Sequence, residues 1–265
     1  MMRREKPVAG TYYHLYNRGV RQEPIFLENS DRIRFLFLLL YCQLPLPLSN
    51  NEYHANLFEK HGSFYLHANR DQILAALSSR RVELVNFCLM PNHFHLSVLA
   101  RTNFPIERGG RAARKIASAG KDSDMRDASE ENLHGRAKEE SGIPKYMQRA
   151  LNAYTKYFNI KHKKTGHLFQ GPYQLVRVKN NDQLLHLSAY IHRNPRELRE
   201  WRGREFDYPH SSLQDFVGEN RWGELLKPDI VLGQFKSGSD YKRFVETSSA
   251  KTLENKLEKE HQFEE

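Results

Sequence analysis

Two histidines that flank a single phenylalanine are the residues of this chain best suited to chemistry. His93, Phe94 and His95 lie in the run VELVNFCLMPNHFHLSVLA, whose apolar and β-branched residues favour a buried strand. Side chains alternate between the two faces of a strand, so both imidazoles leave one face while Phe94 enters the other. Two adjacent imidazoles form half of a divalent-metal site. The alternative is that the histidines merely cap a sheet surface.

A second set of polar side chains lies on a predicted helix later in the chain. The segment QLLHLSAYIHRNP has apolar residues at helical spacing, N-cap candidates at 180–182, and Pro195 to end the helix. His186, Tyr190 and Asn194 follow one another at intervals of four, so all three lie on one helix face. Taken alone, the tyrosine is typical of an interfacial core residue, and an asparagine before proline is typical of a turn.

These two motifs occur with others in an order and spacing that resembles a known family. The chain resembles the REP-associated tyrosine transposases, the single-tyrosine members of the HUH nucleic-acid transferases related to the insertion-sequence-200 transposases. The resemblance covers residues 10–43, 80–100 and 145–245, and MPNHFHL together with YIHRNP is a specific combination. The other matching stretches are YYHLYNRG, FLENSDRIRFLFLL, KYFNIKHKKTGHLFQGPY, DYPHSSLQDFVG, VLGQF and DYKRF.

The resemblance implies an active site and its cofactor. His93 and His95 would hold Mg²⁺ or Mn²⁺, Tyr190 would be the nucleophile, and Asn194 would complete the metal site from the same helix. These residue types suit the chemistry, because a tyrosine hydroxyl with an ordinary pKa of about 10 needs a cation beside the phosphate it attacks. Neutral imidazoles and an amide oxygen bind a cation without cancelling its charge. His186, one turn before Tyr190, is a candidate auxiliary residue that positions the hydroxyl or the phosphate.

The balance of charge favours a polyanionic partner. The 265 residues include 41 Lys and Arg against 32 Asp and Glu, and the formal net charge is +9. Residues 142–181 contain no acid, and aromatic residues are interleaved with the basic ones. Cations can contact phosphates while rings stack on unpaired bases, which predicts single-stranded DNA as partner; the resemblance adds hairpin DNA. A solvated helix face is the alternative. The predicted DNA-binding residues are Lys145, Arg149, Lys156, Lys161, Lys163, Lys164, Arg177 and Lys179.

The hydrophobic pattern predicts an α+β fold. An antiparallel sheet with helices on its faces suits the order of the elements, and the resemblance implies a ferredoxin-like sheet with the HUH motif on a central strand. After Gly166, HLFQGPYQLVRV is expected to form a projecting hairpin that could grip DNA or cover a sheet edge. The other expected elements are strands at 12–17, 82–90 and 93–99, helices at 31–41 and 144–162, and the helix that carries Tyr190.

We expect one catalytic domain with additions. Residues 1–195 are expected to form the catalytic domain, which the resemblance implies is of the single-tyrosine HUH type, with insertions at about 44–79 and 101–143. Residues 196–246 contain too many apolar anchors for a tail, which predicts a small C-terminal helical appendage that could bind a DNA hairpin or buttress the catalytic helix. Residues 247–265 are expected to be a polar tail.

The remaining features exclude several classes of protein. Cys42 and Cys88 have apolar neighbours and unlike spacings, so neither a disulfide framework nor a zinc site is expected, and a reducing cytoplasm is the default location. A transmembrane segment and a signal peptide are not evident, which argues against a membrane partner. The sequence leaves a monomer and a homodimer open.

Three functions follow from these patterns. The first is a metal-dependent single-strand DNA endonuclease and strand transferase that acts through a 5′-phosphotyrosine intermediate. The second is a DNA-binding or regulatory protein of the same fold without strand transfer. The third is a metal-dependent phosphodiester hydrolase, in which the histidines activate water and Tyr190 is structural.

Overall fold

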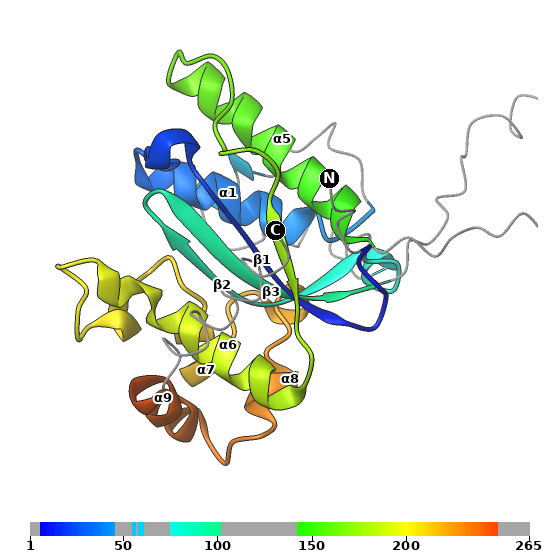
Figure 1. Ribbon diagram of the computed structural model, residues 1–265, viewed down its shortest axis with the longest axis vertical. Coiled ribbons are helices and arrows are strands. Elements are labelled where there is room, and N and C mark those ends of the chain that lie inside the picture. The colour runs from blue at the N-terminus through cyan, green and yellow to red at the C-terminus, as the bar shows by residue number, and fades with distance from the viewer. Residues whose placement is uncertain (1–5, 46–54, 57, 61–74, 102–141, 249–265) are drawn as a thin grey trace, which may run out of the picture.

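The fold is a four-stranded antiparallel sheet between two layers of helices (Figure 1). The computed structural model describes residues 6–45, 55–56, 58–60, 75–101 and 142–248. In these ranges the strands are β1 (Tyr12–Arg18), β2 (Val82–Met90), β3 (His93–Ala100) and β4 (Gln174–Arg177). The helices are α1 (Asn29–Tyr41), α5 (Ile143–Lys161), α6 (Asn181–Arg193), α7 (Leu213–Val217), α8 (Asp229–Leu232) and α9 (Gly238–Thr247). Short 3-10 turns span Val20–Gln22, Asn194–Glu197, Glu205–Asp207 and Gly223–Leu225.

The sheet places β1 and β3 at its centre. Its strand order is β2-β3-β1-β4, and every neighbouring pair is antiparallel. Helix α1 follows β1 and helix α5 follows β3, and Figure 1 shows both on one side of the sheet, with α6 to α9 on the other. This arrangement confirms the predicted α+β class and the antiparallel sheet.

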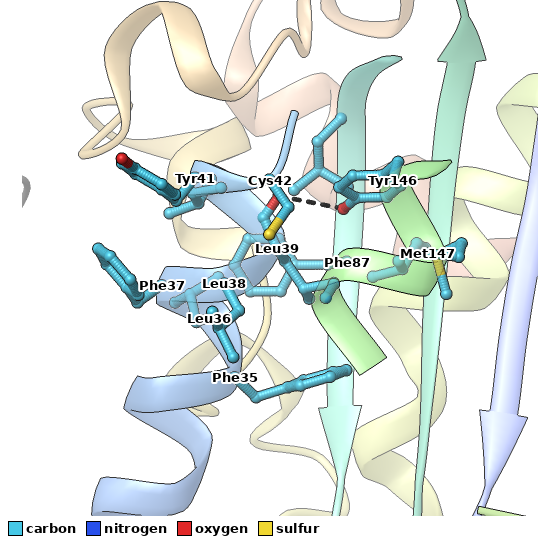
Figure 2. Packing of buried hydrophobic residues seen from close by; sticks show 14 of the residues in the cluster. Phe35, Leu36, Phe37, Leu38, Leu39, Tyr41, Cys42, Phe87, Tyr146 and Met147 are labelled. Carbon is cyan, nitrogen blue, oxygen red and sulfur yellow. Dashed lines mark hydrogen bonds between the residues drawn. The ribbon is translucent and has the colours of Figure 1, made fainter. Parts of the chain in front are cut away.

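The first core fills the space between the sheet and the α1–α5 layer. Phe94 of β3 contacts Phe35 of α1, and Phe35 in turn contacts Tyr154 of α5, with ring centroids 5.1 and 4.7 Å apart. Figure 2 shows the neighbouring part of this core, where the buried Tyr146 hydroxyl donates to the Leu39 carbonyl at 3.1 Å. The buried side of α5 therefore belongs to this core.

On the opposite face a chain of buried hydrogen bonds joins the sheet to α6. The Ser97 hydroxyl donates to Asn86 Oδ1 at 2.5 Å, and Asn86 Nδ2 donates to Ser188 Oγ at 2.8 Å. Ser188 Oγ lies 2.6 Å from the hydroxyl of Tyr241, which is also 2.6 Å from His192 Nδ1. These residues come from β3, β2, α6 and α9, so the chain fixes α6 against two strands and against the C-terminal helices.

The residues after 196 form short helices and turns that cover the outer edge of β2. Tyr208, Phe216 and Tyr241 share the second core with α6, and His192 Nε2 lies 2.8 Å from Ser212 Oγ. Unpaired groups of an edge strand need partners. The appendage supplies these partners through three backbone hydrogen bonds: Leu89 N donates to His210 O, Ser212 N to Phe87 O, and Lys227 N to Leu84 O. The appendage therefore buttresses the helix that carries Tyr190.

Most of the two predicted insertions and of the polar tail lies outside the described residues. Within the first insertion, Phe58 is buried, and its ring lies 5.7 Å from Phe37 and 5.5 Å from Trp222. Cys42 and Cys88 are both buried and free. Within the described ranges, the helices all fall short of the length and apolarity that crossing a membrane requires.

The expected projecting hairpin at 167–178 is wrong. The φ of 84° at Gly171 supports the expected turn. The segments before and after this turn do not pair with each other, however. Phe169 forms a bridge with Gly19, and β4 pairs with β1 from Tyr13–Arg177 to Tyr16–Gln174. The exposed edge of β1 provides a longer set of backbone partners than the short arms could give one another. The segment covers a sheet edge, which was one of the two expected roles.

The hydrogen-bond chain predicts a large effect of a single hydroxyl on stability. Tyr241→Phe leaves Ser188 and His192 with one buried partner fewer each, which should lower the free energy of unfolding by about 1–3 kcal/mol. Urea unfolding followed by circular dichroism measures it. Tyr12→Phe, at the edge of the same core, is the matched control and should change stability by less than half as much. Equal effects of the two substitutions would contradict the role of the chain.

Candidate active site

A cleft of about 600 Å³ opens between the central strands and α6. Its position follows from strand alternation, because the side chains of β1 and β3 that point away from the first core face α6. The lining residues come from β1, β3, β4, α6 and the turns beside them. They are His14, Tyr16, Asn17, Arg18, Gln22, Asn92, His93, Phe94, His95, Gln170, Gln174, Val176, Tyr190 and Glu197.

Strand β3 presents both predicted histidines to this cleft. His93 is half-buried and His95 is buried, and their ring centroids lie 5.1 Å apart. Phe94 between them belongs to the first core on the other face. The histidines therefore share one face of an inner strand, as the sequence predicts.

Hydrogen bonding fixes which nitrogen of His93 carries the proton. Asn92 Nδ2 donates to the Gln22 carbonyl at 3.1 Å, which orients Asn92 Oδ1 toward His93 Nδ1 at 2.7 Å. An amide oxygen can only accept, so Nδ1 of His93 is the donor. The neutral ring then has its lone pair on Nε2, the atom needed for metal binding.

Burial keeps both imidazoles neutral. It lowers the pKa of His93; Asn194 partly offsets this, and the charge of Arg18 adds to it. Burial also holds the pKa of His95 well below its ordinary value, and the neighbouring rings of His14 and His93 lower it further. A metal ligand must be unprotonated, so these shifts favour coordination at neutral pH.

Helix α6 brings Tyr190 to the same cleft, and Asn194, the residue that follows the helix, lies next to His93. The helix begins at the predicted cap, where Asn180 Oδ1 accepts from Gln183 N at 2.8 Å. The ring centroid of Tyr190 lies 5.4 Å from that of His95, at an interplanar angle of 80°. Asn194 Nδ2 donates to the Tyr190 carbonyl at 2.9 Å, which leaves the amide oxygen for another partner.

The oxygen of Asn194 tests whether the residues of this site fit a cation. Asn194 Oδ1 is buried and makes no hydrogen bond to the described residues, although the amide is close enough to His93 to raise the pKa of that ring. An unsatisfied buried oxygen is costly unless a ligand or water meets it. Two neutral imidazoles and this oxygen fit a divalent cation whose other ligands come from water or phosphate. The described residues contain no group of three His, Cys, Asp or Glu side chains placed to hold a metal, so this site offers two imidazoles and an amide oxygen.

The cleft contains functional candidates to which the sequence patterns assigned no role. His14 and Tyr16 project from β1, Arg18 follows them on the same face, and Glu197 adds a carboxylate from the turn after α6. The alternation of the YYHLYNR strand could have indicated the first three. No pattern in the sequence indicated Glu197, because its position depends on the turn that follows Asn194.

His186 lies away from the cleft. Its Nδ1 is 3.0 Å from Ser248 Oγ and its ring is 5.4 Å from that of Phe244 on α9. The auxiliary role predicted for it stays a prediction, and this contact with α9 does not favour it. His192, on the other side of α6, is wholly buried in the hydrogen-bond chain.

The predicted DNA-binding residues divide into two groups. Arg149 donates to the Leu44 carbonyl, and Lys161 lies 3.0 Å from both Glu28 and the buried Asp31. Both cations therefore bind within the α1–α5 layer: Arg149 meets a backbone carbonyl, and Lys161 meets acids that α1 and its N-cap supply. The other six side chains are exposed: Lys145, Lys156, Lys163, Lys164, Arg177 and Lys179.

The exposed lysines of α5 differ in their distance from the cleft. The helix has 19 residues and is therefore about 28 Å long. Its N-terminus lies beside Arg101, at the end of β3 remote from His93. At its other end, Lys164 shares a cavity of about 330 Å³ with the turn at 20–24, which continues from the cleft wall. Lys163 and Lys164 are thus at the cleft end of the molecule and Lys145 is at the opposite end.

Comparisons with known proteins give one structural likeness. No protein-family model matches the sequence, and no curated protein matches it. A solved structure of a REP-associated tyrosine transposase bound to a REP hairpin aligns with 87% of this chain and 92% of that chain, at 13% sequence identity and a TM-score of 0.41. A likeness at this level carries no information about the site, whose chemistry follows from the geometry of the cleft.

The burial of His95 predicts that its ring stays neutral at pH 6, where an ordinary histidine with a pKa of about 6.5 is mostly protonated. Its folded pKa is depressed, so protonation occurs only when the pH falls well below this value. Nitrogen-15 spectra of histidine-labelled protein, assigned with His95→Gln, measure the titration. In urea the same signal should return to the ordinary pKa. A folded-state midpoint near pH 6.5 would contradict the effect of burial on this ring.

Proposed function

We propose that the protein is a metal-dependent single-strand DNA endonuclease and strand transferase of the HUH type. The observation that carries this proposal is the convergence of four side chains. Tyr190, His93 and His95 line one cleft, and Asn194, whose buried oxygen has no hydrogen-bond partner among the described residues, lies next to His93. Neutral imidazoles, an amide oxygen and a hydroxyl nucleophile are the groups needed to transfer a phosphodiester without a protein carboxylate on the cation.

Tyr190 would carry the covalent step. Its oxygen attacks the scissile phosphorus, the bond from phosphorus to the 3′ oxygen breaks, and the 5′ end remains on the protein as a phosphotyrosine. The departing 3′ oxygen takes a proton, and Glu197 in the same cleft is the candidate acceptor for the proton that Tyr190 releases. Because one phosphoester replaces another, an incoming 3′ hydroxyl can reverse the step without a nucleotide energy source.

His93, His95 and Asn194 would hold the cation. A bound Mg²⁺ or Mn²⁺ would stabilise the charge that develops on the scissile phosphate. The protein contributes in two ways. Burial keeps the two rings neutral, and Asn194 Oδ1 is left without a protein hydrogen-bond donor among the described residues. The two histidines are held by the inner strand β3, as a preorganised site requires, and Asn194 is held at the end of α6.

The topology supports a ferredoxin-like arrangement around this site. Two β-α-β units, β1-α1-β2 and β3-α5-β4, interleave so that their first strands lie side by side at the centre. The motif histidines lie on one of those central strands. Figure 1 shows α6 on the face opposite to α1 and α5, where it can deliver Tyr190 to the histidines.

The partner would be a single strand or a hairpin with an unpaired flank. Six exposed cations from the acid-free stretch are accessible to phosphates, with Lys163 and Lys164 at the cleft end. One observation favours the hydrolase alternative, since Glu197 could orient water in place of Tyr190. The covalent adduct distinguishes the two reactions, because hydrolysis by water leaves no DNA on the protein. A regulatory DNA-binding protein would bind DNA but show neither cleavage nor an adduct.

We expect a denaturation-resistant adduct between the protein and single-stranded DNA that carries the flanks of its own gene. Incubation with Mn²⁺ followed by denaturing electrophoresis detects it. Tyr190→Phe lacks the nucleophilic oxygen and should give no adduct while binding DNA normally. His95→Gln and chelation of the cation should also abolish it, and Tyr173→Phe, outside the cleft, is the matched control. Cleavage that persists in Tyr190→Phe would support the hydrolase instead.

Binding and cleavage should separate under mutation. Charge reversal at Lys156, Lys163 or Lys164 should weaken DNA binding and reduce the salt dependence, by about 0.7 counterion for each phosphate that the variant no longer binds. The control is Lys236→Glu, the same change at an exposed site on the C-terminal appendage. Fluorescence anisotropy at several salt concentrations measures both quantities. If only the control showed a weaker affinity, the DNA path would lie on the appendage.

A further inference from the structure

His14 is a buried histidine of the cleft wall to which the proposed reaction assigns no role. It projects from β1, is 4% exposed, and stands opposite Ser97 in the β1–β3 register. Its Nε2 lies 2.9 Å from His95 Nδ1, with 20° between the two ring planes. A short distance between nearly coplanar rings is the geometry of an N–H···N hydrogen bond.

This contact allows two arrangements of protons. In one, His95 Nδ1 donates to His14 Nε2, and the lone pair of neutral His95 is on Nε2. In the other, His14 donates, His95 Nδ1 accepts, and the proton of His95 occupies Nε2. Only the first arrangement leaves His95 with a nitrogen for a cation in the cleft, because its Nδ1 is already occupied by His14.

We propose that His14 is a positioning residue that holds His95 in the tautomer protonated on Nδ1, with Nε2 directed to a divalent cation. This inference rests on the proposed function, since it concerns the same metal site. Ligating histidines commonly donate their second N–H to a neighbouring acceptor, which fixes the ring and the tautomer. His14 would be that acceptor, supplied by the adjacent central strand.

The other histidine of the site supports the inference independently. His93 also has its Nδ1 engaged, at 2.7 Å from the oxygen of Asn92. Each imidazole thus meets a neutral partner at Nδ1, one from the β2–β3 turn and one from β1. If the Nε2 atoms of both rings are to point to one cation, both rings should be hydrogen-bonded through Nδ1. Neutral acceptors also leave the positive charge of the cation available to the phosphate.

Activity alone would not isolate this role, because His14 also approaches the nucleophile. Its ring centroid lies 6.2 Å from that of Tyr190, at an interplanar angle of 82°. Removal of His14 could therefore move Tyr190 as well as His95. The decisive measurements are cation affinity and the protonation of His95, neither of which requires DNA.

The experiment compares Mn²⁺ binding by the full chain and its variants in calorimetric titrations at one neutral pH. His14→Ala should weaken binding about 10- to 100-fold. His14→Gln, whose amide oxygen can still accept from His95, should bind within a few-fold of the unchanged protein. The matched control is His167→Ala, the same substitution at an exposed histidine that does not line the cleft. It should bind Mn²⁺ normally.

A second measurement keeps the inference testable if His14→Ala does not fold. In nitrogen-15 histidine spectra of the unchanged protein with Mg²⁺, His95 should carry its proton on Nδ1. A proton on Nε2, or unaltered affinity in a folded His14→Ala, overturns the inference. If His95→Ala also binds Mn²⁺ normally, the proposed metal site itself fails. If His95→Ala abolishes binding and His14→Ala does not, only the role of His14 fails.

Discussion

The position of Tyr190 depends on one chain of buried hydrogen bonds between the sheet and α6. It runs from Ser97 through Asn86 and Ser188 to the hydroxyl of Tyr241. Apolar packing is non-directional and would allow a helix to slide or rotate over the strands. A buried polar group without its partner costs about 1–3 kcal/mol, so each link opposes such a shift. Ser188 is close enough to Tyr190 in the helix that fixing one also fixes the other.

Strand alternation supplies a second constraint, which acts on the histidines. β3 is an inner strand with a different environment on each face: Phe94 enters the aromatic core, and its two neighbours enter the cleft. A shift of one residue in the register would place both imidazoles in that core and Phe94 in the cleft. The cost of burying unpaired imidazoles among rings excludes this register. The spacing that makes the pair suitable for a cation therefore also specifies the strand.

The sequence predicts the parts of the site whose causes are local. Period-two alternation predicts the shared face of His93 and His95, and helical spacing with an N-cap and a proline predicts α6. His14 could not be predicted in its role, because its partner lies 81 residues away and one histidine on a strand has no pattern. The pairing of Lys161 with Asp31 was missed for the same reason, since an acid-free stretch of sequence need not be acid-free in space. The hairpin prediction was wrong because β4, the second arm of the expected hairpin, pairs with the edge of β1 instead of with the first arm.

The two constraints together determine which part of the site can move. β1 and β3 are hydrogen-bonded on both sides, so His14, His93 and His95 shift only if the sheet itself deforms. Tyr190 and Asn194, by contrast, lie on one helix and its end, and both move whenever α6 moves. A displacement of α6 would therefore change the distances from Tyr190 and from the amide oxygen of Asn194 to the histidines in a single step. The residues after 196 hold α6 through Tyr241 and Ser212, so any contact that the appendage makes with a partner acts directly on this distance.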